Sequence, residues 1–74
     1  MKNTIHIGEI ICAQLAKDGR SKKWLAEKTY YEYSYFCKIL KKPSIDTELL
    51  LCISLLLQYD FFAVYSAHLG IQNK

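Results

Sequence analysis

The side chains with the clearest chemistry in this sequence are basic, and they gather in one segment. Between Arg20 and Lys42 seven residues are basic and two are acidic, whereas the rest of the chain carries three basic and five acidic residues. Clustered ammonium and guanidinium groups attract phosphates and release the counterions bound to them. The charge division therefore indicates either a phosphate-binding segment or a solvated lysine face, and the position of the lysines has to decide between the two.

Other kinds of site find little support in the residue types. His6 and His68 lie at opposite ends of the chain, and neither has the spacing to a cysteine that zinc ligands show. The three cysteines, Cys12, Cys37 and Cys52, are odd in number and lie in apolar stretches, which indicates unpaired thiols in a reducing compartment. We expect no metal, no cofactor, no small-molecule ligand and no enzymatic activity, because catalysis needs a nucleophile beside a base or paired carboxylates.

Length and composition predict one globular domain. The chain has 74 residues, of which 51% are hydrophobic, and a chain of this length supports only one core. The segment from Met1 to Gly8 lacks the features of a secretory signal. The apolar run from Leu49 to Leu57 is far shorter than the ~20 residues of a membrane span. We therefore expect a cytoplasmic protein that does not contact a membrane.

Apolar spacing and capping residues predict an all-α fold, a compact bundle of four or five short helices. Gly19 is suited to end the first helix, and Pro43 to stop the third. Ser21 is a good N-cap for the second helix, and Ser44 or Asp46 for the fourth. The expected helices span about residues 6–18, 21–29, 32–41, 45–57 and, as a short last helix, 61–69.

Two short helices joined by a tight turn, from about residue 21 to residue 42, form a helix-turn-helix pattern. The pattern resembles that of the phage-repressor and Cro-like proteins, the XRE family of regulators. The resemblance extends from about Ile7 to Leu57 and rests on the spacing of Ser21, Leu25-Ala26-Glu27-Lys28, Tyr31, Phe36, Ile39 and Pro43. It implies a lambda-repressor-like domain whose recognition helix, about residues 32–41, enters the major groove of duplex DNA.

The resemblance also assigns contacts on the DNA. Lys22 would reach a phosphate or a base edge beside Lys23, and Lys41 and Lys42 would hold the backbone. The full set of expected DNA contacts is Lys22, Lys23, Tyr33, Ser34, Cys37, Lys38, Lys41 and Lys42. The recognition helix has no arginine, so the bidentate contact to guanine that most often gives strong sequence readout is missing there.

Two residues depart from the family pattern. Tyr30 stands at the turn position where the family usually has glycine, so the turn either has another geometry or holds a tyrosine at positive φ. Glu32 would repel a phosphate, and it is better explained as a helix cap. We expect Tyr31 and Tyr35 to pack in the core or at its rim, and Trp24 to buttress the two motif helices.

Two functions remain open. The first is a DNA-binding transcriptional regulator of repressor type, acting as a homodimer on a palindromic site. The alternative is a protein-interaction module of the same fold, such as an antirepressor or a subunit of a larger complex, without sequence-specific DNA binding. Phe61, Phe62 and Tyr65 either close the core or contact the second copy of a dimer.

Overall fold

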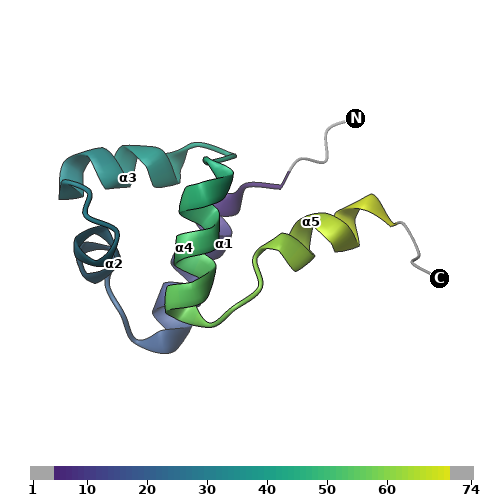
Figure 1. Cartoon of the computed structure of the whole chain (residues 1–74), viewed down its shortest axis with the longest axis horizontal. Coiled ribbons are helices and arrows are strands. Elements are labelled where there is room, and N and C mark those ends of the chain that lie inside the picture. The colour runs from purple at the N-terminus through teal and green to yellow at the C-terminus, as the bar shows by residue number, and fades with distance from the viewer. Residues whose placement is uncertain (1–4, 71–74) are drawn as a thin grey trace.

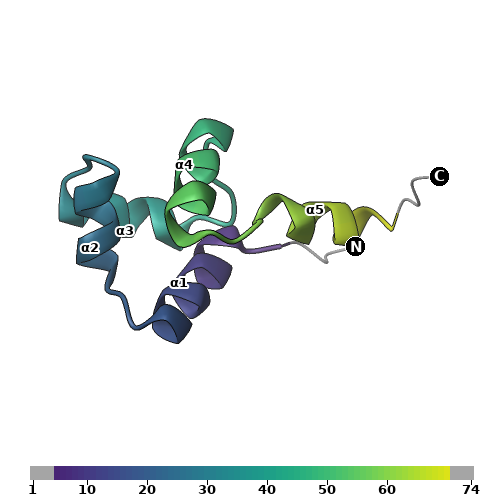
Figure 2. The same ribbon diagram turned by 60° about the horizontal axis from the view of Figure 1, so that its bottom comes forward.

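The computed structural model describes residues 5–70, and within them the protein is all-helical. The helices are α1 (Ile7–Asp18), α2 (Lys22–Lys28), α3 (Tyr33–Lys41), α4 (Thr47–Leu57) and α5 (Phe62–Leu69). The first four form one body, and α5 projects from it in both views (Figures 1 and 2). The predicted all-α bundle is confirmed.

Side-chain caps fix where most of these helices begin. The Ser21 hydroxyl accepts a hydrogen bond from the Trp24 backbone N–H at 3.0 Å, and the Glu32 carboxylate accepts one from the Tyr35 N–H at 3.1 Å. The first predicted helix is one residue too long, because His6 is the N-cap of α1 and its Nδ1 accepts from the Glu9 N–H. Such caps satisfy backbone donors that the first helical turn leaves without partners.

The predicted start of the fourth helix, at about residue 45, is wrong. The Asp46 carboxylate accepts from the N–H groups of Glu48 and Leu49, each at 3.1 Å, so α4 begins at Thr47. Of the two candidate caps it is Asp46, and not Ser44, that caps the helix. Ile45 therefore lies in the connecting segment, half-buried against the core.

The core lies where the first four helices converge. Its largest fully buried side chains are Phe36, Phe61, Ile7, Ile11, Leu15, Leu25 and Ile53. Phe61 has no exposed surface, so the alternative of a contact between two copies is wrong for this residue: it closes the core. No residue of α5 is buried, and Phe62 and Tyr65 keep accessible surface.

A close backbone contact joins α1 to the end of α3. Gly8 is buried on the first turn of α1, and a side chain there would overlap the backbone carbonyl of Leu40. Two hydrogen bonds flank this contact, from the Ile7 N–H to the Pro43 carbonyl at 2.9 Å and from the ring Nε2 of His6 to the Lys41 carbonyl at 3.0 Å. These contacts fix the orientation of α3 on the body.

Among residues 5–70 no single helix is long and apolar enough to cross a membrane. Only α4 and α5 taken together have that length and composition, and they are bent by 113° relative to each other.

Candidate nucleic-acid interface

The turn between α2 and α3 is held by hydrogen bonds back to α2. The Tyr31 N–H donates to the Ala26 carbonyl at 2.9 Å, and the Thr29 hydroxyl donates to the Leu25 carbonyl at 2.8 Å. Tyr30 lies between them with a φ of 63° and 95% of its surface exposed. The turn therefore has the left-handed geometry for which glycine is best suited, and the tyrosine ring contributes no packing that would offset its strain.

One side of α3 faces the core, and this determines which of its side chains are directed toward solvent. Phe36 and Leu40 are fully or almost fully buried, at 0% and 4% exposure. Residues spaced by three and four positions share a helix face, so two ridges lie away from the core. Their members are Ser34, Lys38 and Lys42 on one ridge, and Tyr33, Cys37 and Lys41 on the other.

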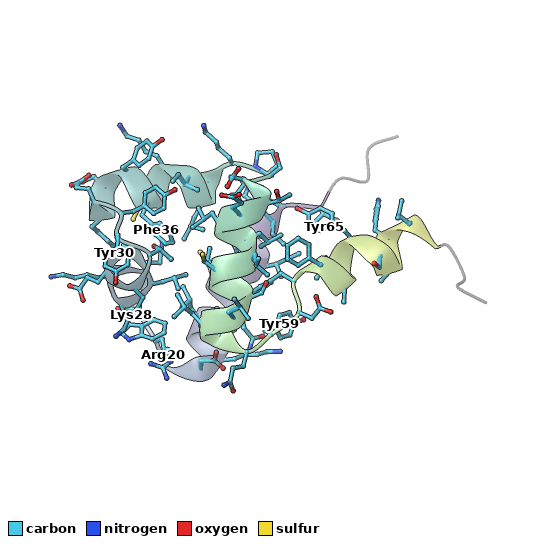
Figure 3. All side chains as sticks on the ribbon, in the orientation of Figure 1. Arg20, Lys28, Tyr30, Phe36, Tyr59 and Tyr65 are labelled. Carbon is cyan, nitrogen blue, oxygen red and sulfur yellow. The ribbon has the colours of Figure 1, made fainter. Side chains whose placement is uncertain are left out.

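We call these six residues the α3 face. All are exposed except Cys37, which is half-buried. The structure therefore brings together, on one face of α3 and its C-cap, six of the eight residues expected at the DNA. Figure 3 shows α3 side chains pointing away from the body along the edge of the molecule.

The acidic residue that directly precedes this face in the sequence is already engaged. Glu32 directs its carboxylate to the Tyr35 N–H at the start of α3, as expected for a cap. From Tyr33 to Lys42 the sequence has no acidic residue. A phosphate approaching the α3 face would therefore meet ammonium groups and hydroxyls from α3 itself.

Tyr33 and Cys37 form a pair on consecutive turns of α3. A hydrogen bond with the Cys37 thiol, and then the charge interaction with it, hold the pKa of Tyr33 above its ordinary value of 10.0. A tyrosine phenol is protonated at neutral pH even at its ordinary pKa, so Tyr33 is able to donate to a phosphate oxygen or a base acceptor, and the upward shift only extends that range to higher pH.

The two remaining expected contacts lie on α2. Lys22 and Lys23 are exposed on its first turn, directly after the Ser21 cap, while Leu25 and Ala26 bury the opposite side. Trp24 is half-buried against the core and carries the Arg20 guanidinium 4.1 Å above its ring. This arrangement agrees with a packing role for Trp24, and the stacked Arg20 adds a fixed positive charge next to Lys22 and Lys23.

Sequence reasoning placed Tyr35 in the core or at its rim, and the structure puts it at the rim. It is 56% exposed, and its ring centroid lies 5.9 Å from that of Tyr31, which is half-buried. With Ile39, Ile45 and Leu49 these rings line a groove of about 460 Å³ between α3 and α4. Tyr35 and Ile39 are four residues apart, so the sequence already indicated that they share a face of α3. That this face is turned toward α4 is seen only in the structure.

No protein-family model, curated protein or solved structure matches the chain.

Proposed function

We propose that the chain binds duplex DNA through the α3 face and acts as a transcriptional regulator of repressor type. The observation that carries the proposal is the α3 face itself, where three lysines and two hydroxyls lie together. The opposite side of α3 packs against α1 through the contact of Gly8 with Leu40. A major groove is wide enough to admit such a helix. Lys22 and Lys23 on α2 would contact the phosphate backbone beside it.

The chemistry of the face favours binding to the backbone over strong base discrimination. A lysine ammonium is a compact charge, whereas the planar guanidinium of arginine can form two hydrogen bonds with one guanine. Helix α3 contains no arginine. Tyr33, Ser34 and Cys37 are the residues of the face that would touch base edges or a thymine methyl. We infer moderate sequence preference, with a further contribution from the shape of the groove.

The test is duplex binding at several salt concentrations. Log affinity against log salt should be linear and steep, and Lys38→Gln should lower the slope by about 1 because one phosphate contact is lost. Lys17→Gln is the matched control: it removes the same charge from an exposed position on α1, outside the proposed interface. A flat salt dependence, or equal effects of the two substitutions, would exclude the proposed interface.

A second candidate is a protein-interaction module of the same fold. The observation that favours it is Tyr30, a large aromatic side chain that is almost wholly exposed at a strained turn. Strained and exposed residues often belong to a contact surface. Tight binding of a protein partner that Tyr30→Ala weakens, together with no duplex binding at low salt, would select this candidate over the first.

A further inference from the structure

The outer face of α4 is unusually apolar for a surface. The helix has eleven residues and only one of them, Glu48, is charged. Its inner side supplies four buried residues to the core, and yet Leu51 and Leu55 on the outer side are 50% and 69% exposed. A helix that is apolar on all sides is normally covered on all sides.

This apolar face continues into a hollow at the base of α5. The hollow has a volume of about 320 Å³ and is lined by Ser44, Ile45, Thr47, Leu50, Phe62 and Tyr65. Thr47 connects the two features, since Thr47, Leu51 and Leu55 are spaced by four residues and form one ridge along α4. The protein thus exposes a leucine at one end of the ridge and an apolar hollow at the other.

We propose that this α4–α5 face joins two copies of the chain. In a two-fold pair with antiparallel α4 helices crossing at Leu51, Leu55 of each copy lies opposite Thr47 of the other, because both are four residues from the crossing point. Each Leu55 side chain then enters the hollow of the other copy. Phe62 and Tyr65 contact the second copy in this arrangement as walls of the hollow.

The residues favour a second copy over a different partner. The face has one carboxylate, at Glu48, and its hollow is mainly apolar, although Ser44, Thr47 and Tyr65 bring hydroxyls to it. Its projecting leucine and its hollow therefore match each other better than they match a charged surface. The eleven residues of α4 extend about 16 Å at the usual rise per residue. Specific interfaces bury at least about 1,000 Å² in total, and a face as short as this one lies near that lower limit. The dimer should therefore be weak and concentration-dependent, and it is independent of the proposed DNA binding.

The experiment is sedimentation of the full chain without DNA over a range of micromolar concentrations. The wild type should shift from monomer to dimer, and Leu55→Glu should raise the dissociation constant at least about tenfold, because the carboxylate would be buried without a partner. Leu69→Glu is the matched control: Leu69 is equally exposed, at 66%, but lies at the far end of α5. Circular dichroism should show both variants folded.

A thiol cross-link gives a second readout. Cys52 is exposed and follows Leu51, the residue at which the two α4 helices cross. The two-fold symmetry places both copies of Cys52 beside the crossing point, on the same side of the helix pair. In a Cys12→Ser, Cys37→Ser background a short bis-maleimide should yield covalent dimers that Leu55→Glu suppresses and Leu69→Glu does not. The proposal is overturned if the wild type stays monomeric, if Leu69→Glu disrupts the dimer and Leu55→Glu does not, or if the face binds lipid vesicles in preference to a second copy.

Discussion

Replacing Gly8 by alanine is the sharpest test of how α3 is positioned. A Cβ built at Gly8 overlaps the carbonyl oxygen of Leu40 and lies 2.6 Å from its carbonyl carbon. Ordinary contacts of a Cβ begin near 3.4 Å, and backbone atoms cannot swing aside as the end of a flexible side chain does. The substitution therefore has to separate α1 from the end of α3.

The cost follows from what the separation breaks. It strains the hydrogen bonds from Ile7 to Pro43 and from His6 to Lys41, each worth ~0.5–1.5 kcal/mol, and forcing a methyl into a closed contact costs ~1–3 kcal/mol. The better helix propensity of alanine returns up to ~1 kcal/mol. The net loss is about 3 kcal/mol, which in a domain of this size lowers Tm by roughly 12–24 °C.

Thermal and denaturant unfolding followed by circular dichroism measure this loss. Gly19→Ala is the control, because a Cβ at Gly19 meets nothing within 4 Å and costs only the strain of a φ of 70°, about 1 kcal/mol. If Gly8→Ala unfolds within about 0.5 kcal/mol of the wild type, the close contact between α1 and α3 does not exist in solution and the reasoning fails.

The remaining predictions concern the turn, a cap and the Tyr33–Cys37 pair. Tyr30→Gly should raise stability by up to ~1 kcal/mol, since it removes positive-φ strain and almost no packing; a lower Tm would contradict this. Asp46→Ala should cost ~1 kcal/mol, because the N–H groups of Glu48 and Leu49 lose their acceptor, and Asp46→Asn should recover most of it in chemical denaturation. Cys37→Ala should lower the pKa of Tyr33 toward 10.0, so that its phenol ionises at lower pH in an NMR titration, and an unchanged midpoint would show that the thiol is not the cause.

Much of the fold could be predicted from local sequence. Ser21 and Glu32 were expected as caps and are caps, and Gly19 ends α1 in the left-handed conformation. These features depend only on residues within one helical turn, and local chemistry decides them. The α3 face was predictable for the same reason, because the spacing of Phe36 and Leu40 determines which side of the helix is buried.

Features that depend on distant residues could not be predicted in this way. Gly8 looks like an ordinary small residue near a helix start, and only its contact with Leu40 on another helix explains it. The sequence did not show whether Phe61 closes the core or contacts a second copy, because either role needs a large apolar side chain at that position. The structure decides for the core, where Phe61 is fully buried. The start of α4 was open for a different, local reason: Ser44 and Asp46 are both suitable caps, and it is Asp46 that accepts the hydrogen bonds.

The contacts of α1 with α3 and the lysines of the α3 face have separable effects on the proposed DNA binding. Gly8 and His6 contact the end of α3 on the side opposite to the α3 face. Changes at these residues therefore alter the fraction of molecules in which α3 has the orientation that binds DNA. Lys38 and Lys41 carry the charges, so changes there alter how many counterions are released. Loosening α3 should consequently lower affinity at every salt concentration by the same factor, whereas removing a lysine should change the slope. Parallel lines in one case and diverging lines in the other would separate positioning from contact in a single set of titrations.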